Sequence, residues 1–453
     1  MEPNDRREPN DREPNTTEAN DREPNGQVSR RSVLSMMGVG MATRKLPRAR
    51  RKPVVAPSVS TVGATTTSAA ASPSTTAAAS STVPTTPGIL VTVALYGGND
   101  GLNTVIPLDA GPYLQGRGAL AYQATEAIAL GDGLGLHPAL TGLKGLWDKK
   151  QLAIVRGVGY PEPSRSHFRS NDIWNSAQPK GYADTGWLGR WYDTVGTDPL
   201  GMVAIASSVP RSMVGAKTSA VVVPLGNVTS SVPADLAKAT VVMSQSDDTL
   251  GPVAAMVRTN SLNLGRVNEV FGPLLAGQAA TSITTSLEPG AAPRTANELD
   301  LQLNVVARLI KAGAPTRAYS VGLGGFDTHA NEKANHARLM GILDKALSGF
   351  ANLMAQDPLG RTVTVLVTSE FGRRVAANGS GGTDHGTAAP VFVLGPSVKG
   401  GFYGDQPPLT NLDQGDLRFT IDFRAVYTTL LGAVLGADPK VSVDGTFPPL
   451  GFL

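Results

Sequence analysis

Acidic and imidazole side chains gather between two apolar runs in the last third of this sequence. The first run, Thr362–Thr368, ends just before Glu370. The second run, Ala388–Leu394, follows Asp384 and His385. Runs of this length that are rich in Val and Thr are typical of buried strands, and the polar loop between them is long for a tight hairpin. Because ligands bind at the carboxyl ends of strands in open α/β sheets, we interpret this loop as one wall of a site.

Two further apolar runs end in residues of the same chemical types. Gly88–Tyr96 reads as a strand, and a glycine-rich turn that contains Asp100 follows it. Tyr319–Leu323 reads as another strand, and Asp327 and His329 come directly after it. A single Asp in a turn is common, but acids after several successive strands indicate a shared site.

A fourth candidate segment joins a strand to a helix. The apolar run Leu152–Val158 leads into a polar stretch with Ser164, Arg165, Ser166 and His167. Ser and Pro are favoured in the first turn of a helix, and a helix amino terminus with basic side chains can bind an anion. An ordinary capped helix with exposed arginines explains this segment equally well.

The residue types narrow the chemistry. The chain has no cysteine and five histidines, which excludes disulfides, thiol chemistry and thiolate zinc sites. Carboxylates and imidazoles are ligands of divalent ions, so the strand ends predict a metal or anion site. The alternative is a set of turn acids and buried, hydrogen-bonded histidines. We interpret His137 as a packing or capping residue.

Charge and hydropathy exclude two broad classes of partner. The 453 residues carry a net charge of +3. Residues 1–52 contain 12 basic and 8 acidic residues, which leaves 28 basic and 29 acidic residues in the remainder. The folded part is therefore near neutral, and we expect no nucleic-acid partner. The sequence also contains no run of about twenty apolar residues that could span a membrane.

The N-terminal segments have the composition of unfolded chain and a targeting signal. Residues 1–28 repeat a polar motif and are predicted to be disordered. Residues 29–52 contain Arg30 and Arg31 ahead of a short apolar stretch, which resembles a twin-arginine export signal. Basic residues follow where a small-residue cleavage site is expected, so a solvated basic segment is the alternative. Residues 53–87, rich in Ala, Ser, Thr and Pro, predict a linker.

The remaining residues, 88–453, predict one α/β domain. Helical periodicity at 296–312 and 339–354 alternates with the strands described above. Strand, helix and strand form a βαβ unit, which places Asp327 and Glu370 at the same edge of a parallel sheet. Residues 200–295 contain no motif, and we expect them to form a cap or insertion near the site.

Five motifs in order give this domain a resemblance to a known family. They are GGNDG at 97–101, RSHFR at 165–169, FDTHAN at 326–331, SEFGR at 369–373 and GTDHG at 382–386. Residues 88–453 resemble the bacterial exported family called domain of unknown function 1501, a distant branch of the alkaline phosphatase and sulfatase superfamily. The resemblance implies a doubly wound, mostly parallel α/β sheet with metal ions at the strand ends.

The resemblance also implies metal ligands. Asp100, Asp327 and His385 match metal-binding positions, and the partner of Asp327 would be His329 or His336. Phe371 stands where those phosphatases have a second metal-binding His, so we expect one tightly held ion, zinc. Asp100 and Glu370 would form a weaker, oxygen-only position suited to calcium or magnesium, or left empty. Asp384, directly before His385, is a further candidate ligand.

The same resemblance leaves the nucleophile open. Pro161 occupies the position of the sulfatase nucleophile, so Ser164 or Ser166, or a water molecule, would have to attack. Arg165 and His167 would then stabilise charge or transfer a proton.

Two functions fit the sequence. The first is an exported, metal-dependent hydrolase of phosphate or sulfate esters, or of a related small anionic substrate. The second is a non-catalytic exported protein that keeps this fold as a binding or structural module. Both imply a periplasmic, cell-surface or extracellular location.

Overall fold

The computed structural model describes residues 88–109, 111–196, 198–225, 252–275 and 298–453. The segments 1–28, 29–52 and 53–87, with the proposed export signal, lie outside the described residues, as does part of the predicted insertion at 200–295.

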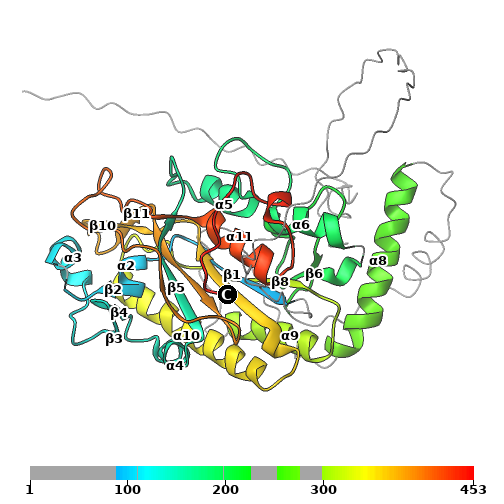
Figure 1. The fold of residues 1–453 in the computed structure, drawn as a ribbon, viewed down its shortest axis with the longest axis horizontal. Helices are drawn as coiled ribbons and strands as arrows, with labels where there is room; N and C mark the ends of the chain where they lie inside the picture. The colour runs from blue at the N-terminus through cyan, green and yellow to red at the C-terminus, as the bar shows by residue number, and fades with distance from the viewer. Residues whose placement is uncertain (1–87, 110, 197, 226–251, 276–297) are drawn as a thin grey trace, which may run out of the picture. The chain divides into compact units, whose positions relative to one another are not determined.

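A nine-stranded sheet forms the centre of the described domain (Figure 1). Its strand order is β13-β5-β12-β9-β1-β8-β6-β7, and β14 pairs with β5. All of these pairs are parallel except those of β12, which runs antiparallel to both β5 and β9. The strands are β1 (Ile89–Leu95), β5 (Leu152–Gly159), β6 (Met202–Ala204), β7 (Val221–Val222), β8 (Ala318–Leu323), β9 (Val363–Ser369), β12 (Ala389–Leu394), β13 (Gly401–Tyr403) and β14 (Ile421–Asp422).

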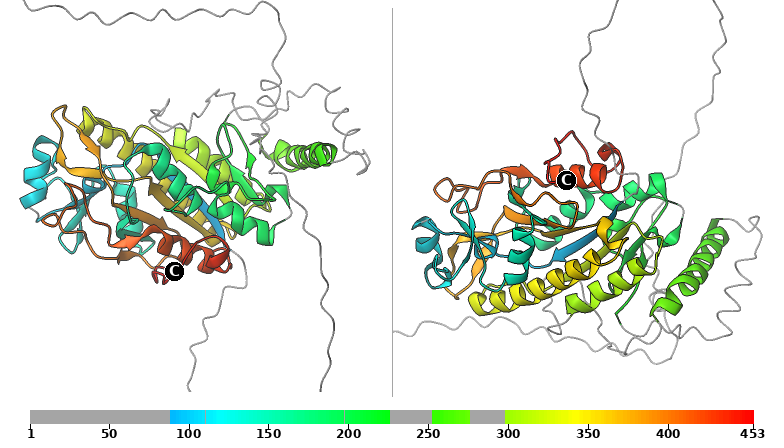
Figure 2. Two further views of the ribbon diagram at one scale, coloured as in Figure 1. Left: turned by 90° about the horizontal axis from the view of Figure 1, so that it is seen from above. Right: turned by 60° about the horizontal axis from the view of Figure 1, so that its bottom comes forward.

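Helices cover both faces of this sheet (Figure 2). One apolar core joins the sheet to α4 (Thr141–Asp148), α9 (Glu298–Lys311) and α10 (Glu332–Ala355). A second core on the opposite face joins it to α5 (His167–Ser176), α6 (Trp187–Val195) and α11 (Phe423–Ala433). This is the doubly wound, mostly parallel α/β fold that the sequence predicts.

The alternation of side chains along β1 explains the two cores. Leu90 belongs to the core on the α5 side, whereas Val91 and Val93 belong to the core on the α10 side. All three are fully buried. A strand buried on both faces reads as a continuous apolar run, which is why the sequence locates it well.

Two small sheets and several further helices accompany the central sheet. An antiparallel sheet has the order β2-β4-β3, and β10 pairs with β11 in a two-stranded hairpin. The helix α8 adjoins α9 through a hydrogen bond from Arg308 to the carbonyl oxygen of Leu274. These elements are β2 (Val105–Pro107), β3 (Ile128–Gly131), β4 (Leu134–Leu136), β10 (Arg373–Ala377), β11 (Thr383–His385), α2 (Gly101–Thr104), α3 (Gly111–Arg117) and α8 (Pro252–Leu275). Single 3-10 turns complete the set: η1 (Gly118–Leu120), η2 (Pro199–Gly201), η3 (Arg211–Met213), η5 (Gly360–Thr362) and η6 (Pro439–Val441).

The loop predicted between Glu370 and the next strand contains regular structure. Within it, β10 and β11 pair antiparallel, with Arg373 opposite His385. The hairpin reverses the chain and returns it as β12, antiparallel to β9. In the predicted insertion, β6 and β7 extend the edge of the central sheet.

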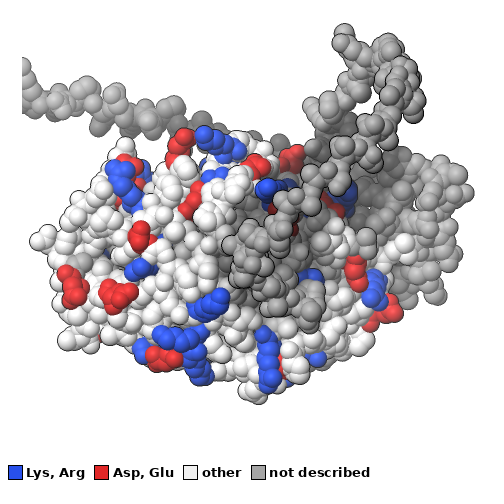
Figure 3. Space-filling model, in the orientation of Figure 1, with Lys and Arg blue, Asp and Glu red and all other residues white. Residues whose placement is uncertain are grey.

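The surface is of mixed charge. On the face shown in Figure 3, acidic and basic side chains are interspersed over the described residues. Within the described ranges, no helix is both long and apolar enough to cross a membrane.

Candidate metal centre

Three side chains from different elements meet at the carboxyl edge of the sheet. Nε2 of His385 lies 3.0 Å from Oδ1 of Asp327, and Nε2 of His167 lies 3.4 Å from the same oxygen. One ligand atom from each of these residues lies within 4.8 Å of the other two. Two imidazoles and a carboxylate at this spacing are a ligand set for a divalent ion.

A fourth side chain borders this cluster. Nε2 of His329 lies 3.0 Å from Oδ1 of Asp327 and 3.0 Å from Nε2 of His385. With 43 % of its side chain exposed, His329 is more open to solvent than His167 or His385, at 14 % and 23 %. The cluster is therefore open to solvent on the side of His329.

The fold brings these residues together through tight backbone contacts. Asp327 and His329 follow β8, His167 begins α5, and His385 ends β11. A Cβ atom on Gly382 would lie 2.3 Å from the carbonyl carbon of His329, so only glycine lets the hairpin pass so close. Gly97, after β1, has a φ of 114° and packs in the same way against the main chain of Asp327.

Each imidazole is held from behind by an acceptor. Nδ1 of His167 lies 2.8 Å from Oε1 of Glu370, and Nδ1 of His385 lies 2.8 Å from the carbonyl oxygen of Arg165. A carbonyl oxygen only accepts, so Nδ1 of His385 carries a proton, and Nε2 is the nitrogen left to bind Asp327 or, once deprotonated, a metal ion. Glu370 favours the same tautomer for His167. Nδ1 of His329 has a looser partner, Oδ1 of Asp384 at 3.5 Å. Second acceptors of this kind orient histidines that bind metal ions.

Arg373 fixes the carboxylate at the centre. Its buried guanidinium donates to Oδ1 of Asp327 at 2.7 Å and to the carbonyl oxygens of Gly98, Thr383 and Phe326 at 2.7, 2.8 and 3.0 Å. It also donates to the carbonyl oxygen of Gly97. Burial would raise the pKa of Asp327, but hydrogen bonds from His167, His385 and Arg373 hold it well below its usual range. Asp327 is therefore ionised.

The electrostatics of His167 show that the cluster attracts positive charge. Burial would lower the pKa of its imidazole, but the hydrogen bonds to Asp327 and Glu370 raise it to about 9. The same two carboxylates that favour a proton on this ring favour a cation bound to it.

The structure does not bring Asp100 into this cluster. Both of its carboxylate oxygens bind the buried guanidinium of Arg117, with Nη2 to Oδ1 at 2.7 Å. Oδ1 also caps α2 by accepting from the N–H groups of Leu102 and Asn103 at 3.2 and 3.4 Å. Burial would raise the pKa of Asp100, but Arg117 holds it well below its usual range. Asp100 was predicted to converge with His385, but it is not one of the clustered ligands, because Arg117 already neutralises this carboxylate.

His336 also lies apart from the metal ligands. Its Nε2 is 3.0 Å from Oδ1 of Asn99, its ring meets that of His137 at a centroid distance of 5.5 Å, and burial lowers its pKa to about 4. Glu332 belongs to the same buried group: it accepts from the hydroxyl of Thr383 at 2.6 Å. Burial and the nearby Asp100 raise its pKa to about 9. This buried group contacts the β10–β11 hairpin through the hydrogen bond between Glu332 and Thr383.

Glu370 supports His167 instead of forming an oxygen-only position with Asp100, and Asp384 lies beside His329. Besides His167, Glu370 accepts from the N–H of Gly97 at 2.8 Å and from the hydroxyl of Ser369 at 3.1 Å. The Asp384 side chain is 56 % exposed and accepts from Nδ2 of Asn378 at 3.3 Å. The oxygen ligands predicted for a weakly bound second ion therefore do not lie together.

The residues predicted to be catalytic differ in their placement. His167 lies within the cluster itself, whereas the guanidinium of Arg165 pairs with the buried carboxylate of Asp416, with Nε to Oδ2 at 2.8 Å. The hydroxyl of Ser164 accepts from the N–H of Ser166 at 3.2 Å. Ser166 is exposed, precedes α5 and makes no capping hydrogen bond with its side chain.

Two residues central to this geometry were missed from the sequence. In the sequence Arg373 is only the last residue of the SEFGR motif, and nothing in its spacing reveals that it would bind four carbonyl oxygens and Asp327. Arg117 has no motif around it, and only its full burial next to Asp100 marks it.

Comparison with known proteins agrees with the sequence resemblance. Residues 279–437 match the family described as "Protein of unknown function (DUF1501)", which confirms the predicted family over that stretch. It includes Asp327, His329, Glu370 and His385. No curated protein matches the sequence.

Solved structures similar to this chain include a lipoteichoic acid synthase, a protein of the alkaline phosphatase superfamily and an alkaline phosphatase. The lipoteichoic acid synthase LtaP of Listeria monocytogenes is 9 % identical, with a TM-score of 0.37 over 79 % of this chain and 74 % of that one. An alkaline phosphatase superfamily protein of Vibrio parahaemolyticus is 8 % identical (TM-score 0.34; 79 % and 69 % covered). The alkaline phosphatase of the Antarctic bacterium TAB5 is 12 % identical (TM-score 0.32; 69 % and 92 % covered). At these scores the overlap is weak, so function must rest on the chain's own residues.

Proposed function

We propose that this protein is a metal-dependent hydrolase of phosphate or sulfate esters, or of a related small anionic substrate. The observation that carries the proposal is the convergence of His167 and His385 on Asp327, with each ring held at Nδ1 by a separate acceptor. When Nε2 of each ring gives up its proton, two lone pairs and an ionised carboxylate are directed at one point, which suits a cation bound between them. Two imidazoles and one carboxylate, with one open side, fit zinc.

A divalent ion bound there supplies Lewis-acid polarisation of the substrate oxygen. The chain's own residues do the rest. Arg373 keeps Asp327 ionised and fixed, while Glu370 and the Arg165 carbonyl keep His167 and His385 in the tautomer that binds through Nε2. His329 is the exposed member with the loosest support, so we assign proton transfer to its Nε2.

The nucleophile is assigned to Ser166. Its hydroxyl is free of a capping bond, it is exposed, and it directly precedes His167. Ser164 is less suited, because its hydroxyl already accepts from the main chain. If a Ser166→Ala variant keeps full activity, the nucleophile is a water molecule and not Ser166.

One observation favours a second function, a non-catalytic binding or structural module that keeps the fold, with or without one ion. Across the described ranges, no serine hydroxyl is hydrogen-bonded to a histidine, and the Arg165 guanidinium is occupied by Asp416. A catalytic serine is normally joined to its base.

Metal analysis combined with two assays separates these functions. Purified protein should hold close to one equivalent of zinc and cleave an aryl phosphate or an aryl sulfate. His385→Ala should lose both the metal and the activity, whereas Asp405→Asn, which changes an exposed acid away from the cluster, should keep both. Bound metal without any esterase activity would favour the binding module. Absence of bound metal together with absence of esterase activity would refute the hydrolase and leave the binding module.

In this proposal the N-terminal segments contain an export signal. The Arg30–Arg31 pair would direct the folded protein across the membrane by the twin-arginine route, with 53–87 as a linker to the domain at 88–453.

A further inference from the structure

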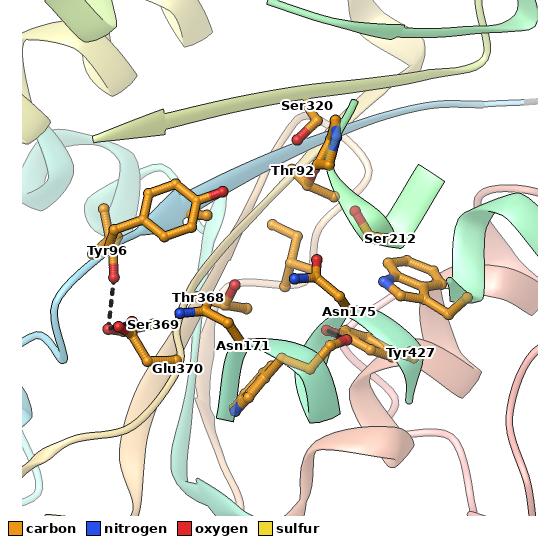
Figure 4. A pocket seen from close by; sticks show the side chains of 16 residues that line it. Thr92, Tyr96, Asn171, Asn175, Ser212, Ser320, Thr368, Ser369, Glu370 and Tyr427 are labelled. Atoms are coloured by element: carbon orange, nitrogen blue, oxygen red, sulfur yellow. Dashed lines mark hydrogen bonds between the residues drawn. The ribbon is translucent and has the colours of Figure 1, made fainter. Parts of the chain in front are cut away.

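A cavity lies under α5, on the face of the central sheet opposite α10 (Figure 4). The space open to the centre of a water molecule is about 50 Å³. Its floor comes from β1, β8 and β9, and its roof from α5, with Ser212 and Tyr427 at its sides. A single water needs roughly 10–15 Å³ measured in this way, so the cavity has room for several waters or a small organic molecule.

The floor of this cavity is polar where a central sheet is usually apolar. Thr92 of β1 lies opposite Ser320 of β8, and Ala94 of β1 lies opposite Thr368 of β9. These residues all line the cavity. Strands buried on both faces normally carry Val, Ile and Leu on each side. Adjacent hydroxyls on three strands therefore indicate a surface built to bind polar groups.

Two buried donors on the roof have no partner. Asn171 and Trp174 of α5 both line the cavity. Nδ2 of Asn171 and Nε1 of Trp174 are buried and make no hydrogen bond within the protein. The Trp174 side chain is more than nine-tenths buried, and Figure 4 shows Asn171 extending into the cavity toward Thr368. A buried donor left unsatisfied costs about 1–3 kcal/mol. A bound acceptor would remove that cost.

Charge defines what the acceptor can be. The cavity is lined by no Lys, Arg or His, and Glu370 is its single ionisable acid. The Glu370 carboxylate already accepts from Gly97, Ser369 and His167. An anion would be repelled by Glu370, and a cation would leave the Asn171 and Trp174 donors unpaired. An uncharged molecule with hydroxyl groups satisfies the donors and matches the Thr and Ser hydroxyls, which both donate and accept.

The cavity adjoins the candidate metal centre without being part of it. His167, Asn171 and Trp174 are spaced i, i+4 and i+7 and so share one face of α5. His167 is at the metal end, and Trp174 lies about 10 Å further along the helix at 1.5 Å per residue. Glu370 stands between the two, because it lines the cavity and holds Nδ1 of His167.

We propose that this cavity is a binding site for a small uncharged polyol, separate from the metal centre. The ligand hydroxyls accept from Asn171 and Trp174 and exchange hydrogen bonds with Thr92, Ser320 and Thr368. Because Glu370 forms one end of the cavity, occupancy fixes the carboxylate that orients His167.

The Trp174 indole N–H gives a direct measurement of binding. Glycerol and ethylene glycol are titrated into the full-length, metal-free protein while the indole ¹H–¹⁵N signals are followed, with Trp174→Phe assigning the Trp174 signal. A saturable shift of that signal is expected. Asn171→Leu, which has a similar size and no donor, and Thr368→Val, which loses only a hydroxyl, should each raise the Kd at least about tenfold, the effect of losing one hydrogen bond. Glycolate and ethanolammonium, the charged probes of similar size, should give no saturable shift.

Three results would overturn this inference: no saturable shift with either glycerol or ethylene glycol, wild-type affinity in both Asn171→Leu and Thr368→Val, or tighter binding of glycolate. If the indole N–H contacts only water and neither glycerol nor ethylene glycol displaces that water, the cavity is a hydration site and the inference is wrong. The His385→Ala variant provides the check against the proposed function. It should bind glycerol as the wild type does, so a failed metal assay leaves this result unaffected.

Discussion

The Nδ1 atom of His385 lies 2.8 Å from the main-chain carbonyl oxygen of Arg165. This contact joins two motifs that are 220 residues apart, and it uses the backbone of Arg165. The guanidinium of the same residue faces Asp416, whose side chain is only 1 % exposed. Arg165 therefore positions one metal ligand through its carbonyl and neutralises a buried acid through its side chain.

This division of roles predicts how Arg165→Ala behaves. The carbonyl oxygen remains, so affinity for zinc and the number of ions bound should match the wild type. Stability should fall by about 1–2 kcal/mol, because Asp416 loses its principal partner and keeps only Nε of Arg374 at 3.5 Å. Urea unfolding and zinc titration measure the two quantities. A large loss of zinc affinity in this variant would assign the metal effect to the guanidinium.

Glu370→Gln is the matched change behind the other histidine. Glutamine keeps the size and one acceptor oxygen but removes the charge that favours a cation on His167. Loss of such a supporting carboxylate typically costs 10–100-fold in metal affinity. Zinc titration of Glu370→Gln should thus show a weaker Kd by roughly that factor, with the fold preserved by circular dichroism. Unchanged affinity would mean that Glu370 serves the backbone of Gly97 and not the metal ligand.

The buried pair of Asp100 and Arg117 predicts a purely structural effect. Removing one partner of a buried ion pair costs about 3–5 kcal/mol, because the other charge is left uncompensated. Arg117→Met should show this loss in urea unfolding, and Asp100→Asn combined with Arg117→Met should recover part of it. Arg418→Met, which alters a half-exposed arginine, should change stability by less than about 0.5 kcal/mol. A zinc equivalent lost in Arg117→Met but retained in the double variant would instead tie this pair to the metal centre.

The sequence was sufficient to predict the helices and strands, but not which side chains pair with one another at the site. Strands such as Val363–Ser369 are continuous apolar runs that end in polar residues, so their type and the shared edge of Asp327 and Glu370 could be predicted. The observed site differs from the predicted one because its side chains pair with residues that are far away in the sequence. Asp100 looked like Asp327 in sequence, since each follows a strand and a glycine turn. Only folding shows that α3 delivers Arg117 to one and that the hairpin delivers His385 to the other.

Export is predicted from residues outside the described domain. Replacing both Arg30 and Arg31 by Lys keeps the charge but removes the paired guanidinium groups that a twin-arginine signal requires. The variant should remain in the cytoplasm of a host with this pathway, whereas the wild type should be transported. Changing Arg50 and Arg51 to Lys, in the basic segment that follows, is the control and should leave transport intact. Equal transport of both variants would assign the first pair another role.

Metal removal should expose a pH dependence that originates at His167. In the metal-free protein its pKa is raised from the ordinary value of about 6.5 to about 9. A raised pKa stabilises the folded state fully below pH 6.5, and this contribution is lost as the pH rises through about 9. Because Glu332 also has a raised pKa and contributes in the same direction, the wild type alone does not isolate His167. The difference between wild type and His167→Gln does. In urea unfolding of the EDTA-treated proteins, that difference in the free energy of unfolding should shrink by on the order of 1–2 kcal/mol between pH 6.5 and 9, after discounting for solvent near the ring.

Zinc binding at pH 7.5 should release close to one proton, measured in buffers of different ionisation enthalpy, because the ion displaces the proton from Nε2 of His167. A pH-independent difference together with no proton release would show that His167 is not a ligand.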